Sequence, residues 1–109
     1  MKRTEADAET YWQVIARDTD IWGNALCLRC GVGKAADVHE ILPRSFFGKS
    51  KEDELFAEKN RCCLCRPCHG LVHNNKGRGE LLQLMREKYH YEYTGRAQCL
   101  LEDYLEEGQ

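Results

Sequence analysis

Residues 60–73 hold the closest grouping of informative side chains in this chain, and they read NRCCLCRPCHGLVH. Cys65 and Cys68 form a Cys-x2-Cys pair within it, and Cys27 and Cys30 form a second pair earlier in the chain. Two such knuckles supply the four thiolates of a tetrahedral zinc site with little strain. The spacing therefore predicts one structural Zn²⁺ held by all four cysteines.

A second register of the later pair is open, because Cys62 and Cys65 are also separated by two residues. We prefer Cys65 with Cys68, since this choice leaves the following helix and its histidines intact. Cys62, Cys63 and Cys99 are then expected to be small core residues. In a reducing compartment, cysteines at such short spacings bind metal more often than they pair as disulfides.

The length of 109 residues predicts a single domain, 1–109, with a thin core that a metal ion would stabilise. No apolar run approaches the ~20 residues that span a bilayer, and residues 1–7 lack the apolar stretch of a signal peptide. We therefore expect a cytoplasmic protein without membrane contact. The net charge is −2, but residues 29–78 hold ten Lys or Arg against six Asp or Glu. This charge by itself selects no partner.

The spacing of apolar residues predicts an α+β fold. The pattern indicates a loop over 45–58 with at most one helical turn, and side chains that alternate between two faces of the first strand. The expected elements are an amphipathic helix over 5–18 (with Tyr11, Trp12, Val14 and Ile15 as its apolar side chains), strands over 35–42 and 61–64, a helix from Pro67 that 74–77 closes, and helices over 79–89 and 98–106.

Three of the four histidines are candidates for a second metal site. His69 and His73 are four residues apart, which places both imidazoles on one face of a helix, about 5–6 Å apart. His39 on the preceding strand would supply a third ligand. Three imidazoles suit transition metals, whereas an added Glu40 oxygen would favour Mg²⁺ or Mn²⁺. We expect His90 to pack among neighbouring aromatic residues.

The order of these motifs resembles that of the HNH endonucleases, particularly the short phage-type members with a four-cysteine structural zinc. The resemblance covers residues 27–75 and includes CLRC at 27–30, DVHEILPRS at 37–45 and NRCCLCRPCHGLVHN at 60–74. It implies a ββα-metal core, in which two strands and a helix surround one catalytic divalent ion (Mg²⁺, Mn²⁺, Ni²⁺ or Zn²⁺). A zinc knuckle and the N- and C-terminal helices would flank this core.

The resemblance also implies a role for each matching residue. His39, His69 and His73 fall on the positions that bind the catalytic ion. Asn60 matches the central Asn of the family, which either holds the catalytic loop by hydrogen bonds or helps to bind the ion. Glu40 falls on the position where the general-base histidine usually stands.

Glu40 is the main departure from the family pattern. A carboxylate with a pKa near ~4.3 is a weaker base than an imidazole near ~6.5. Three interpretations remain open: burial raises the pKa of Glu40 into a useful range, Glu40 binds the ion while His39 is the base, or catalysis has weakened while the fold was retained.

The resemblance implies hydrolysis of DNA phosphodiester bonds, by nicking or by double-strand cleavage. Basic residues near the motifs would contact backbone phosphates, with Arg44 and Arg66 the strongest candidates. The full set is Arg44, Lys49, Lys51, Arg61, Arg66, Lys76 and Arg78. The alternative function is a catalytically weak, zinc-stapled binding module that assists a phage packaging or assembly machine, such as a terminase. A phage-encoded chain would act in the cytoplasm of a bacterial host.

Overall fold

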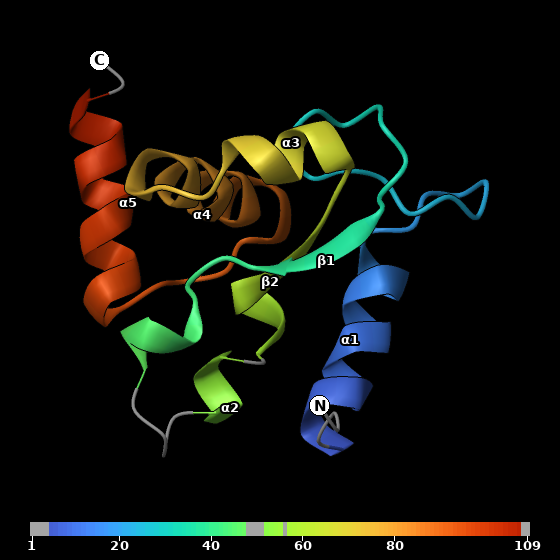
Figure 1. Ribbon diagram of the computed structural model, residues 1–109, viewed down its shortest axis with the longest axis horizontal. Coiled ribbons are helices and arrows are strands. Elements are labelled where there is room, and N and C mark those ends of the chain that lie inside the picture. The colour runs from blue at the N-terminus through green and yellow to red at the C-terminus, as the bar shows by residue number, and fades with distance from the viewer. Residues whose placement is uncertain (1–4, 48–51, 56, 108–109) are drawn as a thin grey trace.

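A short two-stranded antiparallel sheet lies at the centre of the structure, with helices on both of its sides (Figure 1). The computed structural model describes residues 5–47, 52–55 and 57–107. Lys49 and Lys51 lie outside the described residues. The combination of helices with this sheet is α+β, as predicted. The elements are α1 (Glu5–Arg17), β1 (Asp37–Glu40), η1 (Arg44–Phe46), α2 (Glu52–Leu55), η3 (Glu58–Asn60), β2 (Arg61–Leu64), α3 (Arg66–Leu71), α4 (Asn75–Tyr89) and α5 (Gly95–Glu107).

The two strands agree unequally with the sequence prediction. Strand β2 covers the predicted range 61–64, whereas β1 is shorter than the predicted 35–42. Leu42 leaves the strand ladder because its N–H and C=O bond the side chain of Asn60, at 2.9 and 3.0 Å. The polar side chain replaces the backbone partner that a longer strand would need.

The two faces of β1 meet different helices, with α3 on one side and α1 on the other (Figure 1). The His39 ring lies 4.8 Å from the His69 ring of α3, measured between centroids. Glu40 points to the opposite face, where its carboxylate pairs with Arg61, and Arg61 also bonds Asp7 of α1. The predicted alternation of side chains along this strand is confirmed at these positions.

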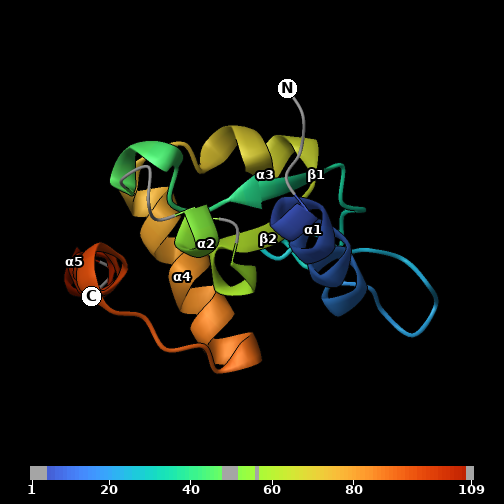
Figure 2. The ribbon, with the colours of Figure 1, turned by 90° about the horizontal axis from the view of Figure 1, so that it is seen from below.

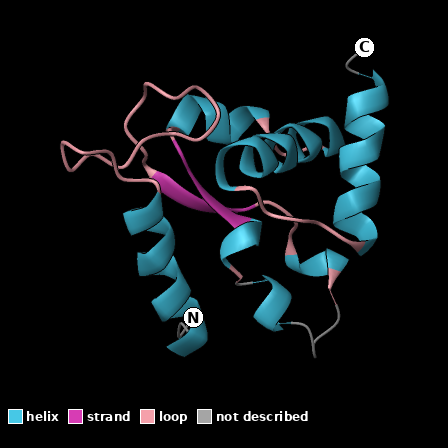
Figure 3. Cartoon of the chain, turned by 180° about the vertical axis from the view of Figure 1, so that it is seen from behind, coloured by secondary structure: helices cyan, strands magenta, loops and turns pink. Residues whose placement is uncertain are grey.

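A loop connects α1 to β1, and short helical turns lie between β1 and β2. Residues 18–36 run from α1 to β1 without a regular element, and isolated bridges join Thr19 to Ala25 and Leu26 to Lys34 (Figure 3). Between β1 and β2, helix α2 is a helical turn of the kind that the sequence allows. The described residues also form the 3-10 turns η1 and η3, so the prediction of at most one helical turn in this segment is wrong.

Helix α3 is shorter than predicted. It ends at Leu71, with Val72 as its C-cap, so His73 lies beyond its last turn. The prediction that one helix carries both His69 and His73 is therefore wrong. The two rings nevertheless lie 4.9 Å apart, because the chain turns back immediately after α3.

Helix α4 begins four residues before the predicted 79. The Asn74 side chain accepts a hydrogen bond from the Gly77 N–H at 2.7 Å and caps the helix. Segment 74–77 therefore starts this helix instead of only closing the preceding one. Helix α5 likewise begins earlier than the predicted 98, at Gly95.

Helices α4 and α5 pack against each other on the side of the sheet away from α1 (Figure 2). Gly79 allows their close approach, because a methyl group there would overlap the Cβ atom of Tyr104. Leu81, Leu82 and Met85 of α4 are fully buried in the core. These three residues form the inward side of α4.

The burial of three apolar residues can be compared with the sequence prediction. Val14 of α1 is fully buried, as its spacing predicts, but Trp12 is 67% exposed. Cys99 is also exposed, so its assignment to the core is wrong. Among the described helices, none is long and apolar enough to cross a membrane.

Candidate metal centres and their surroundings

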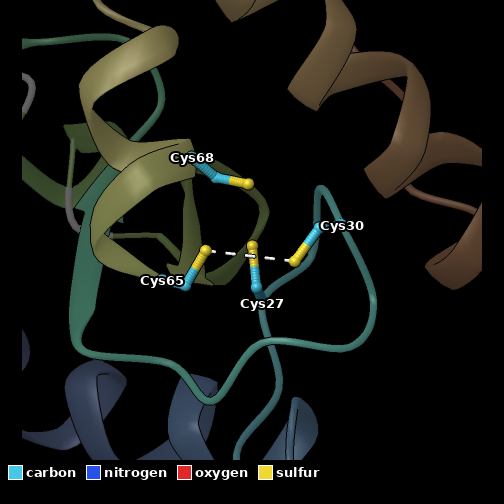
Figure 4. Close-up of side chains that lie close together, drawn as sticks. All are labelled: Cys27, Cys30, Cys65 and Cys68. Atoms are coloured by element: carbon cyan, nitrogen blue, oxygen red, sulfur yellow. Dashed lines mark hydrogen bonds between the residues drawn. The ribbon is translucent and has the colours of Figure 1, made fainter.

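Four cysteine thiols converge between an early loop and the start of α3 (Figure 4). The Sγ atoms of Cys27, Cys30, Cys65 and Cys68 all lie within 4.8 Å of one another, and those of Cys30 and Cys65 are 3.9 Å apart. In a tetrahedral site with Zn–S bonds of ~2.3 Å, neighbouring sulfur atoms are about 3.8 Å apart. The predicted convergence is confirmed, and the four thiols can hold a structural metal ion such as zinc.

The other register of the second pair is wrong. Cys62 lies in β2, is fully buried, and does not belong to the thiol cluster. Cys63 is also buried in β2, and burial raises the pKa of its thiol to about 12. Both residues therefore pack in the core as predicted.

The first knuckle is a turn that backbone N–H groups organise. Gly31 donates to the Cys27 carbonyl at 2.9 Å and has a φ of 74°, which favours glycine. Gly33 donates to Cys30 Sγ at 3.3 Å. The N–H groups of Val32 and Gly33 hold the pKa of Cys30 at about 6. The Cys30 side chain is thus favoured as the thiolate, the form that binds metals.

The second knuckle places one of its cysteines in the interior. Burial raises the pKa of the Cys68 thiol to about 12, although a hydrogen bond from Arg29 acts in the opposite direction. Arg29 Nη1 lies 3.7 Å from Cys68 Sγ, and its Nε bonds Glu80 at 2.6 Å. Because metal coordination deprotonates a thiol, a bound ion would offset the cost of ionising Cys68.

Three imidazoles form a second cluster on the α3 side of the sheet. The ring centroids of His39 and His69 are 4.8 Å apart, those of His39 and His73 5.5 Å, and those of His69 and His73 4.9 Å. A cavity of about 320 Å³ opens against these rings. It is lined by Val38, His39, Glu40, Ile41, Pro43, His69, His73 and Arg78.

The imidazole cluster is looser than the thiol cluster. Within the described ranges, the four cysteines are the one group of three or more potential ligands with all their ligand atoms within 4.8 Å of one another. The histidine side chains would therefore have to rotate to bring their nitrogens to a common ion.

His39 is held in the neutral form that can bind a metal. Burial lowers its pKa to about 4, and the nearby His69, His73 and Arg78 act in the same direction. Its Nε2 atom is buried and makes no hydrogen bond. A buried nitrogen without a partner is costly unless another group, such as a metal ion, occupies the position that it faces.

Asp37 orients the second imidazole. Its Oδ2 atom lies 3.0 Å from Nδ1 of His69, and this hydrogen bond, together with the charge of Arg66, lowers the pKa of Asp37. When Nδ1–H of His69 donates to Asp37, Nε2 is left to bind an ion. A carboxylate behind a histidine is the usual arrangement at a metal site. The sequence prediction missed Asp37, although its position two residues before His39 on a strand places it on the same face.

Glu40 is among the residues that line the histidine cavity, but Arg61 holds its carboxylate on the other face of β1. Its Oε1 atom is 3.2 Å from Nη2 of Arg61, and its side chain is 39% exposed. Arg61 itself is buried and bonds Asp7 of α1. The prediction that Arg61 contacts DNA phosphates is therefore wrong, because its guanidinium is enclosed by the protein.

The side-chain amide of Asn60 forms hydrogen bonds with backbone groups. It accepts from the Leu42 N–H and donates to the carbonyls of Leu42 and Leu55, at 2.9, 3.0 and 2.8 Å. The side chain is buried and joins the end of β1 to α2. Its geometry is that of a clamp on the loop, not of an ion ligand.

The remaining predicted phosphate contacts lie on the surface. Arg44, Arg66 and Lys76 are exposed, and Arg66 Nε lies 3.8 Å from Asp37. Arg78 lines the histidine cavity, and its Nη1 bonds Asn75 at 2.9 Å. His90 lies away from the cluster, as an exposed C-cap of α4, so the expectation that it packs among aromatic residues is wrong.

A buried carboxylate that the sequence prediction missed connects α1 to β2 and α4. Asp18 is 4% exposed and accepts hydrogen bonds from Arg17, from the Cys63 N–H and from Tyr89. Burial opposes ionisation of Asp18, but these donors outweigh it and hold its pKa below the ordinary value. The network fixes the strand that carries Cys62 and leads to Cys65.

Comparison with known proteins finds no relative. No protein-family model, no curated protein and no solved structure matches this chain. The residues and the geometry of the two clusters are therefore the features that bear on function.

Proposed function

We propose that this protein is a metal-dependent endonuclease that hydrolyses DNA phosphodiester bonds, with one structural Zn²⁺ on the four cysteines. One observation carries the proposal: His39, His69 and His73, from different segments, gather at one cavity that Arg78 also lines. The buried, unpartnered Nε2 of His39 and the Asp37–His69 hydrogen bond support a metal at this point.

The histidines would hold a divalent ion, and the surrounding residues would hold the substrate. When bound, such an ion stabilises charge on the scissile phosphate and on the leaving oxygen. Arg78 lies at the same cavity, where its guanidinium can pair with a phosphate of the DNA backbone. Arg44 and Arg66, on the exposed surface, would contact neighbouring phosphates.

Two groups can accept the proton of the attacking water. Glu40 is close enough to the cavity to line it, and it would act as the base after its carboxylate turns away from Arg61. His39 is neutral and would act as the base if Glu40 took its place on the ion. Glu40→Gln separates these two assignments, because it leaves metal binding unchanged if Glu40 is the base and weakens metal binding if Glu40 is a ligand of the ion.

The test is cleavage of supercoiled plasmid by the zinc-loaded protein with Mg²⁺, Mn²⁺, Ni²⁺ or Zn²⁺ added. We expect nicked or linear product with at least one ion, and loss of that product in His69→Ala. His90→Asn is the matched control, because it removes an exposed histidine outside the cluster and asparagine tolerates the positive φ at this position. Equal cleavage by His69→Ala and wild type, or no cleavage with any ion, would refute the proposal.

A zinc-stapled binding module is the second candidate, and the Glu40–Arg61 ion pair favours it. This pair holds the carboxylate at the base position away from the imidazoles. Such a module would bind DNA, or a partner in a phage packaging machine, without cutting. Plasmid retardation without cleavage in wild type, together with cleavage by Glu40→His, would support this alternative.

A further inference from the structure

A second cavity lies directly beside the histidine cavity. Its volume is about 330 Å³, and it lies between η1, the Lys59–Asn60 segment and the start of α5. The segment that follows β1 separates the two cavities: Ile41 lines the histidine cavity, and Leu42 lines this one. Neither metal cluster accounts for this second cavity.

Phe46 connects the two cavities through a pair of arginines. The guanidinium carbon of Arg78 lies 5.4 Å from the centroid of the Phe46 ring, and that of Arg96 lies 5.7 Å from it. Arg78 also lines the histidine cavity, whereas Arg96 and Phe46 line the second one. The guanidinium of Arg78 would therefore lie between a planar group in the second cavity and the histidine cavity.

The lining of the second cavity combines planar surfaces with positive charge. Phe46, Phe47 and Tyr93 contribute aromatic rings, and Arg96 and Lys59 contribute exposed cations. Among the described residues of the lining, Glu54 is the one that is acidic. Aromatic rings and guanidinium planes stack on nucleobases, and cations bind the attached phosphates. This chemistry fits a nucleotide better than an apolar ligand or an acidic peptide, since a nucleotide joins a flat ring to a phosphate whereas Asp and Glu side chains carry no ring.

We propose that this cavity binds one unstacked nucleotide of the DNA strand that the protein cuts. The base would stack on Phe46 or on the guanidinium of Arg96, and Arg78 would take the phosphate between this nucleotide and the histidine cavity. The proposal rests on the proposed nuclease function for the identity of the strand. It adds recognition of a nucleobase, which hydrolysis of a phosphodiester bond does not itself require.

The test compares two single-stranded dodecamers of equal charge, one of deoxythymidines and one with abasic sites at every position. Binding to the zinc-loaded protein is measured by fluorescence anisotropy at low salt without added divalent ion. We expect wild type to bind the thymidine strand about tenfold more tightly than the abasic strand, the usual size of one base–aromatic stack. Phe46→Leu should abolish that difference.

Arg96→Gln provides a second variant, because this side chain is exposed and its replacement leaves the core intact. We expect it to weaken binding of the thymidine strand about three- to tenfold, as loss of one phosphate or stacking contact does. Arg86→Gln is the matched control, since it removes the same charge from an exposed position on α4 outside this cavity. It should leave the base-dependent difference unchanged.

The outcomes separate this proposal from the nuclease function. Equal binding of the two strands by wild type, or equal effects of Arg96→Gln and Arg86→Gln, would overturn the nucleotide site even if plasmid is cut. Base-dependent binding without plasmid cleavage under any metal would refute the nuclease function and leave a strand-binding site. Displacement of the thymidine strand by free dTMP at the strand's own affinity would refute a strand site in favour of a free-nucleotide site.

Discussion

Replacing Asp18 with asparagine tests the buried network that fixes β2. In wild type, Asp18 Oδ1 accepts from Arg17 Nε at 2.9 Å and from the Tyr89 hydroxyl, and Oδ2 accepts from the Cys63 N–H at 2.9 Å. An amide presents one oxygen and one donating NH2 group. Whichever way it is placed, the NH2 group faces at least one hydrogen-bond donor.

The arrangement that costs least keeps the Cys63 hydrogen bond and lets the Tyr89 hydroxyl accept from the new amide. Arg17, whose side chain is 12% exposed, then loses its carboxylate. It retains the carbonyls of Glu58 and Arg61, both at 2.7 Å. Removing one partner of a buried ion pair costs about 3–5 kcal/mol. We expect Asp18→Asn to lower the free energy of unfolding by this amount, a large part of the ~5–15 kcal/mol typical of a domain.

The effect should depend on pH in a defined direction. Because the pKa of Asp18 is lower in the folded than in the unfolded chain, its contribution is fully present above the unfolded pKa near 3.8. It is lost as the pH falls through the folded pKa. Urea unfolding of both proteins measures this, and subtracting one curve from the other removes every titration that they share.

Asp103→Asn is the control, since Asp103 is an exposed carboxylate on α5. It should change the free energy of unfolding by less than about 0.5 kcal/mol, as most surface substitutions do. A buried ion pair at Asp18 is refuted if Asp18→Asn lowers the free energy of unfolding by less than about 1 kcal/mol at pH 7, the value of a single neutral hydrogen bond. A wild-type-minus-variant difference that stays constant from pH 7 to pH 3 would contradict it equally.

Three further predictions concern the metal sites and the helix packing. Cys65→Ser should reduce bound zinc from one ion per chain to none and cost several kcal/mol of stability, whereas Cys62→Ala should retain the ion by native mass spectrometry. Glu40→Gln should lower plasmid cleavage about 10²–10⁴-fold without loss of metal binding if Glu40 is the general base, and wild-type rates would show that Glu40 neither takes the proton nor binds the ion. Gly79→Ala should lower the free energy of unfolding by about 1–3 kcal/mol, because the added methyl group overlaps α5. Gly70→Ala has open space around it and should raise the free energy of unfolding by a few tenths to about 1 kcal/mol, which thermal unfolding measures.

The sequence alone was sufficient for features that depend on local spacing. Two residues between cysteines place both thiols of a pair on one side of a turn, so the spacing predicts two knuckles, and the structure then selects Cys65 with Cys68 over Cys62 with Cys65. Alternation along a strand likewise separates His39 from Glu40 without knowledge of any distant residue. These patterns are short enough for backbone geometry to determine them.

Helix ends were less predictable, because a few side chains decide them. The Asn74 cap extends α4 toward its N-terminus, and the early end of α3 leaves His73 outside the helix. His73 still reaches His69, so the predicted proximity holds although the predicted helix does not. Periodicity identifies the body of a helix, whereas capping hydrogen bonds select its ends.

Contacts between distant segments were decided only by the tertiary structure. Asp18 meets Cys63, 45 residues away, and Tyr89, 71 residues away. Arg61 resembles a surface cation in the sequence, yet packing of α1 against β2 buries it between Asp7 and Glu40. No local pattern encodes such pairings, because the free energy that buries a charge comes from partners that packing brings into place. The same packing brings the carboxylate of Asp37 to the imidazole of His69 and holds the carboxylate of Glu40 on Arg61.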